Sequence, residues 1–387
     1  MLAAQSKMTP PPNTRPTAAL IDLDALAFNF QSSKQFIGSD LKYMAVVKAD
    51  AYGHGAVECA LRLQAEGVDW FGVAIPEEGV ELRQAGVTRP ILCLGSFWPG
   101  QESLIVEHHL TPVIFDEHIA DLLNKYATGV GICIDIHVKI DTGMGRVGVR
   151  YERAAEFAAS VKRYENLHVN GLMTHFASAE NPSEDEFTQQ QVKRFNVAVD
   201  QFRDAGHLPE WIDLANSPGA VRHADSRGNM VRLGGALYGL LDDILSPDTK
   251  APELKPVLSL RSEIAHIKQI AAGESLGYGR TFFTKRESLV ALVPVGYADG
   301  YPRNNSVRGR VIINGVAAPV VGRISMDWTL IDVTDIEGVA VGDEVLLIGT
   351  SNGCSITAAD IAKEIDTIGY EITCGISPRV PRIFKEK

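Results

Sequence analysis

Between about residues 41 and 240, short apolar runs alternate with amphipathic segments, a pattern that few folds can accommodate. Eight runs have the near-continuous apolar character of strands buried on both faces: 42–48, 69–75, 90–95, 111–115, 132–141, 169–177, 211–217 and 230–235. The segments between them place apolar residues three and four positions apart, as in amphipathic helices: 56–66, 77–85, 117–126, 151–164 and 185–205. Strands that alternate with helices predict a parallel sheet of the α/β class.

Two α/β architectures fit such an alternation. An open, doubly wound sheet is one, but no G-x-G-x-x-G motif follows any of the apolar runs. Eight strands over about the ~250 residues usual for a barrel favour the other. We therefore predict a TIM-type (β/α)8 barrel.

The pattern changes after Pro252, where alternating apolar residues and turn signals such as Asn314-Gly315 predict a mainly β region. A segment near 358–368 is its one helix candidate. A further apolar run at 17–26 precedes the eight and could pair with this region. The predicted domains are a disordered tail, a barrel domain and a mainly β C-terminal domain: residues 1–16, 17–250 and 251–387.

Composition excludes several classes of protein. The formal net charge of −11 disfavours nucleic acid and anionic membranes as main partners, because like charges repel. There is no run of about 18 apolar residues that would suggest a membrane span. The polar, proline-rich first sixteen residues lack the apolar core of a secretory signal, so we expect a cytoplasmic protein. The five cysteines form no C-x-x-C pair, which gives no sign of a metal site or a disulfide framework; Cys93 and Cys133 are expected in the core.

Polar residues gather where the predicted strands end. They are Lys48, Lys139, Arg146, His175, Asn216, Ser217, Arg232, Gly234 and Gly235. Catalytic groups of such barrels stand at the carboxyl ends of the strands, so we expect these residues at one mouth of the barrel. Several of them follow the seventh and eighth strands, where barrels of this kind often bind phosphate.

Lys48 is the residue that most suggests covalent chemistry. It follows an apolar run, and loss of hydration lowers the pKa of a lysine towards the neutral amine that attacks carbonyl groups. A lysine that reaches solvent at the barrel rim would explain its position alone equally well. The following Tyr52-Gly53-His54-Gly55 favours the first interpretation, because a phenol and a glycine-rich turn that enters a helix suit a phosphate group.

The segment AVVKADAYGHG (45–55) resembles the cofactor-lysine motif of alanine racemases, a family of fold-type III pyridoxal-phosphate enzymes. Further segments resemble motifs of this family in the same order: 137–148, 172–180, 215–217, 232–239, 277–282, 294–303, 322–328 and 376–382. The resemblance spans nearly the whole chain and implies a barrel followed by a β domain. It implies an isomerase that interconverts L- and D-alanine with pyridoxal 5'-phosphate as cofactor, and that supplies D-alanine as a peptidoglycan precursor.

The resemblance also implies a two-base mechanism through a carbanion stabilised by pyridoxal phosphate. Lys48 would hold the cofactor and act as one acid/base group. Tyr278 would be the other, on the opposite face, contributed by the second subunit of a homodimer. Both side chains titrate near pH 10 when unperturbed, so both pKa values must be lowered. His175 would hydrogen-bond Tyr278, and Arg232 would link His175 to the pyridine nitrogen; because a guanidinium only donates, that nitrogen would stay unprotonated.

Other implied roles concern the substrate and the phosphate. Arg146 would bind the substrate carboxylate, and Lys139, whose counterpart in the family is commonly carbamylated, would position Arg146. An ordinary lysine paired with Asp135 or Asp141 is the alternative for Lys139. Met326 would offer its backbone N–H to the carboxylate from the partner chain. The residues expected to bind the cofactor are Lys48, Tyr52, Ser217, Arg232, Gly234 and Gly235.

One position departs from the family pattern. Pro378 stands where many relatives carry a tyrosine that contacts the phosphate and narrows the pocket, so that contact must be lost or replaced. Because the pocket could then be wider, a serine racemase or a racemase of broader specificity is the nearest alternative. Tyr297 and Arg303 would lie along the path to the site. A decarboxylase of the same fold type would need a carboxylate beside the pyridine nitrogen, whereas this sequence offers Arg232, and a cofactor carrier would lack the β domain.

Overall fold

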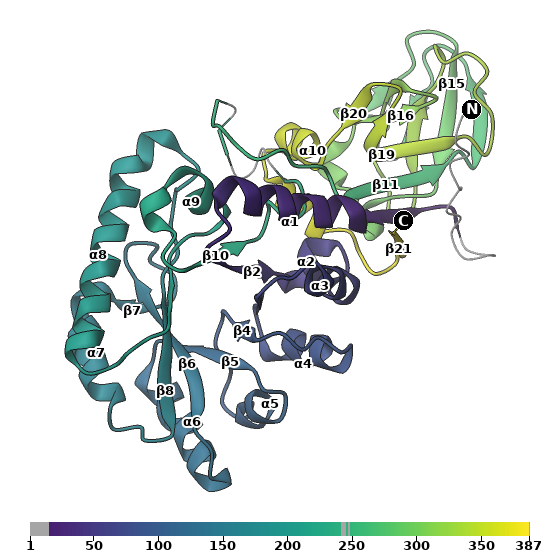
Figure 1. Cartoon of the computed structure of the whole chain (residues 1–387). Helices are drawn as coiled ribbons and strands as arrows, with labels where there is room; N and C mark the ends of the chain where they lie inside the picture. The colour runs from purple at the N-terminus through teal and green to yellow at the C-terminus, as the bar shows by residue number, and fades with distance from the viewer. Residues whose placement is uncertain (1–14, 241–244, 247, 387) are drawn as a thin grey trace. The chain divides into compact units, whose positions relative to one another are not determined.

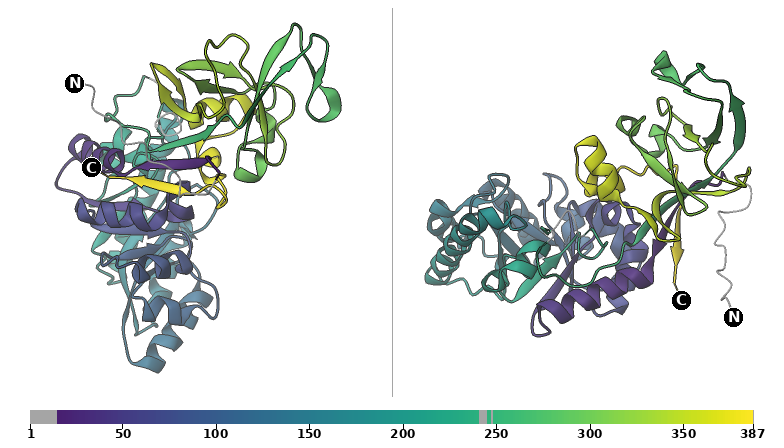
Figure 2. Two further views of the ribbon diagram at one scale, coloured as in Figure 1. Left: turned by 90° about the vertical axis from the view of Figure 1, so that its right-hand side faces the viewer. Right: turned by 90° about the horizontal axis from the view of Figure 1, so that it is seen from above.

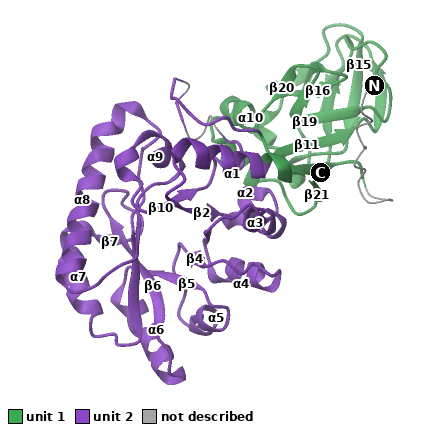
Figure 3. Ribbon diagram, in the orientation of Figure 1, with its two compact units in different colours: residues 1–25, 256–387 green, residues 26–255 purple. Residues whose placement is uncertain are grey.

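The computed structural model describes residues 15–240, 245–246 and 248–386. The predicted disordered tail, 1–16, lies outside the described residues except for its last two positions. The chain divides into two compact units, shown in different colours in Figure 3. One holds residues 26–255, and the other combines the beginning of the chain, up to Ala25, with the residues from Pro256 onward. Within the described part of the chain, no helix is long and apolar enough to cross a membrane.

The eight apolar runs form a closed parallel barrel, which confirms the predicted fold class (Figure 1). In order around the barrel, the strands are β5 (Thr111–Ile114), β4 (Ile91–Cys93), β3 (Trp70–Val73), β2 (Lys42–Val46), β10 (Met230–Leu233), β9 (Trp211–Asp213), β8 (Leu167–Met173) and β6 (Ile134–Asp141). Pairing between β5 and β6, with Val113 opposite His137, closes the ring. A short strand, β7 (Val149–Arg150), adds to β6.

The amphipathic segments form helices on the outside of the barrel strands (Figures 1 and 2). The predicted ones are α3 (Ala56–Ala65), α4 (Pro76–Gln84), α6 (Glu117–Val130), α7 (Ala154–Val161) and α8 (Asp185–Asp204). Local signals delimit α6: the Asp116 carboxylate accepts hydrogen bonds from the N–H groups of His118 and Ile119, and Gly131, in the left-handed conformation, ends the helix. The short helices α5 (Glu102–Glu107) and α9 (Ser217–Arg222) are among those that the sequence did not predict.

Side chains from six strands fill the barrel with an apolar core. They are Met44, Trp70, Leu92, Val113, Met173 and Met230. His137 is buried among them, with its ring centroid 5.5 Å from that of Trp70, and burial lowers the pKa of this imidazole to about 3. Gly171 makes room for the ring, since a Cβ at this position would stand 2.5 Å from it. Cys93 is buried as expected, but the prediction for Cys133 was wrong: it precedes β6 and is exposed.

The other unit is mainly β. Its largest sheet contains β17 (Val316–Pro319), β16 (Arg310–Ile313), β19 (Glu344–Ser351), β11 (Leu258–Glu263), β1 (Ala18–Asp22) and β21 (Arg382–Lys385) in that order, with β20 (Cys354–Ile356) paired to β19. A second sheet contains β12 (His266–Ile270), β15 (Ser288–Val293) and β18 (Thr329–Asp332), and a hairpin contains β13 (Ser275–Leu276) and β14 (Phe282–Phe283). The helix candidate near 358–368 is α10 (Ala358–Ile365), followed by α11 (Gly369–Cys374).

The run at 17–26 pairs with this unit, as the sequence suggested. β1 lies between β11, to which it is antiparallel, and β21, to which it is parallel. Only the first part of the run is a strand. α1 (Leu23–Ile37) begins directly after Asp22, whose carboxylate accepts a hydrogen bond from the N–H of Ala25 at 2.9 Å.

Candidate active site

Lys48 lies directly beyond β2, at the start of a left-handed turn. α2 (Lys48–Gly53) contains four consecutive non-glycine residues with φ between 51° and 57°, from Ala49 to Tyr52. The left-handed conformation costs an L-residue roughly 1–2 kcal/mol, so this turn stores strain that its surroundings must offset. The residue types do not predict this turn, because ADAY (49–52) contains no glycine. The strain lies directly beside the predicted cofactor lysine.

Contacts from both sides stabilise the turn. The carboxylate of Asp50 accepts a hydrogen bond from the N–H of Ala56 at 2.8 Å, which ties the turn to the start of α3. The ring centroid of Tyr238 lies 5.0 Å from that of Tyr52 and 4.6 Å from that of His54, and its hydroxyl donates to the carbonyl of Val46 at 2.9 Å. Tyr52 is thereby held over the ends of β2 and β10.

The residues predicted to bind phosphate come together from three strand ends. The N–H of Gly234, just after β10, donates to the hydroxyl of Ser217, the first residue of α9, at 2.9 Å. A Cβ at Gly234 would stand 2.7 Å from the hydroxyl oxygen of Tyr52, so only glycine leaves that space open. The N–H of Gly235 donates to none of the described residues. Asn216 caps α9, because its side chain accepts from the N–H of Gly219 at 3.1 Å.

Arg232 lies at the centre of a buried hydrogen-bond network. Its guanidinium donates to the carbonyl oxygens of Thr174 and Leu214 at 2.8 and 3.2 Å and meets Nδ1 of His175 at 3.3 Å. It also forms an ion pair with the carboxylate of Asp213. Arg232 is only 3% exposed and Asp213 is fully buried. The Nε–H of Arg232 has no partner among the described residues, so one donor remains for a ligand.

Asp213 is a site residue that the sequence analysis missed. It was the one carboxylate in the apolar run WIDLA, and a charge on a strand buried on both faces needs a partner of opposite charge. That signal could have identified it. Burial raises the pKa of Asp213, whereas the Arg232 guanidinium opposes that rise.

His175 and Lys139 face several positive charges. Burial, followed by the charge of Arg232 and those of nearby cationic groups, lowers the pKa of His175 well below its usual value, so the imidazole is neutral at pH 7. Burial and the charges of Arg232, Arg146 and Lys48 lower the pKa of Lys139 to about 7. Much of Lys139 is therefore an uncharged amine at neutral pH.

The alternative for Lys139, an ordinary ion pair, finds no support. Asp141 is bound to Arg150 at 3.1 Å, and Asp135 to His168 at 2.8 Å. Within the described residues, no ion pair joins Lys139 to either carboxylate. Arg146 lies in the exposed loop between β6 and β7, near enough to act on the pKa of Lys139.

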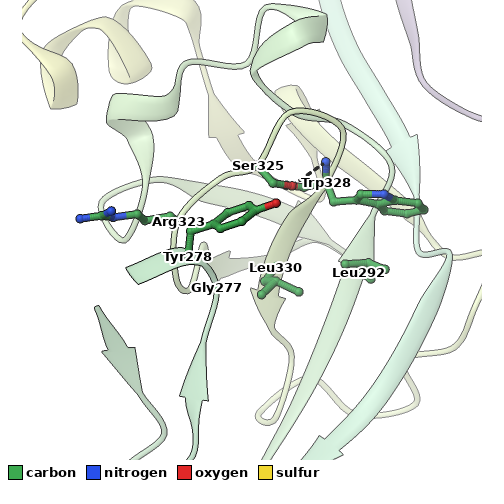
Figure 4. A pocket seen from close by; sticks show the side chains of 7 residues that line it. All are labelled: Gly277, Tyr278, Leu292, Arg323, Ser325, Trp328 and Leu330. Carbon is green, nitrogen blue, oxygen red and sulfur yellow. Dashed lines mark hydrogen bonds between the residues drawn. The ribbon is translucent and has the colours of Figure 1, made fainter. Parts of the chain in front are cut away.

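Tyr278 and Met326 lie on the β-rich unit and are unusually exposed for their size, at 69% and 53%. Tyr278 lines a pocket of about 390 Å³ whose walls are mainly apolar, and its side chain is drawn among the lining residues in Figure 4. The pocket is lined by Gly277, Tyr278, Leu292, Arg323, Ser325, Trp328 and Leu330. The backbone N–H of Met326 donates to none of the described residues, so it is available to a ligand.

The remaining predicted positions are also on the β-rich unit. Tyr297 is 41% exposed, and Arg303 begins a single helical turn. Pro378 is exposed, and the next residue, Arg379, forms an ion pair with Asp327 at 2.7 Å. The two predicted acid/base residues, Lys48 and Tyr278, thus belong to different units of the chain.

Comparison with known proteins agrees over nearly the full length. Family models described as the N-terminal and C-terminal domains of alanine racemase match residues 21–242 and 257–384. An alanine racemase of Halothermothrix orenii is 44% identical over 97% of this chain and 98% of its own length, and one of Geobacter sulfurreducens is 42% identical over 96% and 98%.

Solved structures agree as well. Alanine racemase from Clostridium difficile 630 superposes with a TM-score of 0.90 at 38% identity, covering 96% of each chain. Alanine racemase from Bacillus anthracis with bound L-Ala-P superposes with a TM-score of 0.91 at 35% identity, covering 97% of this chain and 96% of that one. With both family models matched in order and relatives this similar along their whole length, the chain belongs to the alanine racemase family.

Proposed function

We propose that this protein interconverts L- and D-alanine, with pyridoxal 5'-phosphate attached to Lys48. Relatives named alanine racemase over nearly the whole chain support the substrate and the reaction class. The observation that carries the reaction type is Arg232, a buried guanidinium held by Asp213 and His175 with one N–H left for a ligand. Serine and other small amino acids are the alternative substrates, because Pro378 leaves the width of the pocket open.

The residues present fit pyridoxal phosphate. Its aldehyde needs an amine, which Lys48 offers at the end of β2. Its phosphate needs hydrogen-bond donors, and Tyr52, Ser217 and the free N–H of Gly235 lie around the space that Gly234 leaves open. Since the Ser217 hydroxyl accepts from Gly234, its own proton is available to the phosphate. The unpartnered Nε–H of Arg232 suits the ring nitrogen.

When bound, pyridoxal phosphate draws electrons from the α-carbon of the amino acid and so eases removal of its proton. Arg232 limits this effect. Its guanidinium stays protonated and can only donate, so it would leave the ring nitrogen of the bound cofactor unprotonated. A weaker electron sink favours prompt return of the proton over side reactions. The decarboxylase alternative requires a carboxylate at the ring nitrogen, but the carboxylate found here, Asp213, is bound to Arg232.

Inversion at the α-carbon requires that a proton be removed from one face and returned to the other, and Lys48 and Tyr278 would be the two groups that exchange it. Because Nδ1 of His175 accepts from Arg232, its neutral imidazole has its proton on Nε2 and would donate a hydrogen bond to the Tyr278 oxygen. The high exposure of Tyr278 and Met326 supports a second subunit as the place where they act. We therefore propose a homodimer in which each site uses Tyr278 and Met326 of the partner subunit.

Arg146 would bind the substrate carboxylate, and Lys139 would orient Arg146 after reaction with carbon dioxide. The neutral amine adds to the carbon of CO2, a carbamate forms, and one proton is released to solvent. The pKa of about 7 supports this step, because only the uncharged amine reacts. The product would place a negative charge among the positive charges of Arg146, Arg232 and Lys48.

A chiral assay of purified protein with added pyridoxal phosphate tests the function. We expect L-alanine to yield D-alanine and the reverse, with serine assayed in parallel. Borohydride reduction followed by peptide mapping should locate the cofactor on Lys48. Cofactor on any other lysine, or inversion that does not need the cofactor, would contradict the proposal. Cytoplasmic location and the supply of D-alanine for peptidoglycan stay predictions.

A further inference from the structure

Glu78 binds the backbone beyond the ends of two neighbouring barrel strands, β2 and β3, beside Lys48. It is the third residue of α4 and is half-buried. Its Oε1 accepts a hydrogen bond from the N–H of Ala49 at 2.7 Å, and its Oε2 accepts one from the N–H of Ala74 at 2.7 Å. One carboxylate thus joins the residue that follows Lys48 to the residue that follows β3.

The bond to Ala49 acts directly on Lys48. The N–H of Ala49 lies in the peptide plane that also contains the carbonyl group of Lys48, and this plane is rigid. Rotation of the plane is therefore rotation about ψ of Lys48. When Glu78 holds the N–H of Ala49, it fixes the backbone angle from which the Lys48 side chain projects.

The rest of the left-handed turn is held by other groups. The N–H of Ala51 donates to the carbonyl of Val47 at 2.9 Å, and that of Gly55 donates to the carbonyl of Asp50 at 3.0 Å. Asp50 is in turn bound to Ala56. Ala49, the first residue in the left-handed conformation, has Glu78 as the side-chain partner of its N–H.

The location of Glu78 suits a carboxylate that binds N–H groups. It lies in the first turn of α4, where the helix dipole favours negative charge. Hydrogen bonds to a charged group are also stronger than neutral ones. Two N–H groups, those of Ala74 and Ile75, face Oε2, at 2.7 and 3.4 Å, so a glutamine would turn its amide oxygen to them. Its NH2 group would then face the N–H of Ala49, and the bond to Ala49 would be lost.

We propose that Glu78 is a positioning residue for Lys48: it holds Ala49 in its left-handed conformation and so aims the lysine amine at the carbonyl it must attack. The inference rests on the proposed function in one respect, the attachment of pyridoxal phosphate to Lys48. It adds a residue outside the cofactor contacts and assigns a role to the strained turn.

The test compares Glu78→Gln with Glu77→Gln. Glu77 is the matched control, because it is adjacent and exposed and its carboxylate accepts from the side chain of Gln101 rather than from the turn. The first readout is hydrogen exchange at the Ala49 amide in cofactor-free protein. We expect Glu78→Gln to speed this exchange about tenfold to a hundredfold, the range for a lost charged hydrogen bond, and Glu77→Gln to leave it unchanged.

The second readout is the rate at which added pyridoxal phosphate becomes borohydride-trappable on Lys48, measured well below the melting temperature. We expect a loss of about tenfold or more in Glu78→Gln, and none in Glu77→Gln. Ala49→Gly in the Glu78→Gln background should restore part of the rate, since glycine adopts the left-handed conformation without cost. This double variant also serves if Glu78→Gln alone is too unstable to purify: it should then fold and attach the cofactor.

The outcomes separate the two proposals. If the wild type carries the cofactor on Lys48 and Glu78→Gln attaches it equally fast, the positioning role is wrong and the proposed function stands. Unchanged exchange at Ala49, or a double variant no better than Glu78→Gln, overturns the role as well. If the wild type carries the cofactor on another lysine, the proposed function fails, and this inference fails with it.

Discussion

Asp213→Asn removes one negative charge from the barrel and almost no volume. Arg232 is 3% exposed and Asp213 is fully buried, so the pair is screened from solvent. Asparagine keeps an oxygen that can accept from Arg232, but it leaves the guanidinium without a counter-charge. Removing one partner of a buried ion pair typically costs about 3–5 kcal/mol, because the remaining charge stays buried without compensation.

The surroundings of Arg232 place the expected cost at the low end of that range. The carbonyl oxygens of Thr174, Leu214 and Asp213 still accept from the guanidinium after the substitution. We therefore expect the free energy of unfolding of the barrel unit to fall by about 3 kcal/mol, which lowers its folding equilibrium constant by more than a hundredfold.

Urea unfolding of cofactor-free protein, followed by tryptophan fluorescence, measures this loss. Three of the four tryptophans, Trp70, Trp98 and Trp211, lie in the barrel unit, so the signal reports mainly on that unit. Asp135→Asn is the control, because it breaks the exposed pair with His168 and should cost less than about 1 kcal/mol. If Asp213→Asn cost no more than the control, the Asp213 carboxylate would not compensate Arg232 and our reasoning would be refuted.

Three further predictions concern the site and its core. Labelled bicarbonate should give a carbamate NMR signal that grows as the pH rises through about 7, because the protonated Lys139 amine cannot react; Lys139→Ala should remove the signal, and a signal that does not change with pH would contradict the assignment. Tyr278→Phe should slow exchange of the α-proton with deuterium from one enantiomer of alanine much more than from the other, and equal slowing would exclude a one-face role. Gly171→Ala should lower the free energy of unfolding by about 1–3 kcal/mol, since its Cβ would stand 2.5 Å from the buried His137 ring, whereas Gly129→Ala, with no atom within 4 Å, should not destabilise the protein.

Much of the barrel could be predicted because its signals are local. A strand buried on both faces is apolar along its whole length, and a helix that covers it repeats every three to four residues. This apolar pattern predicted both the strand that ends before Lys48 and the strand that contains Arg232. Local signals failed at the edges of elements. Cys133 lies one residue before β6 and is exposed, and the run at 17–26 changes from strand to helix after Asp22.

The order of the elements, the type of barrel and the polar residues at the strand ends follow from sequence patterns, since each depends on residues within a few positions of one another. Which residues become partners in ion pairs and hydrogen bonds depends on how the chain packs. Asp213 meets Arg232 across 19 positions, and Glu78 meets Ala49 across 29. The left-handed turn after Lys48 depends on such partners as well, because nothing in ADAY favours that conformation and only contacts from outside the segment can offset its cost. Charge compensation and strain are settled between distant segments: the local sequence shows that a carboxylate in WIDLA needs a partner, but not which residue provides it.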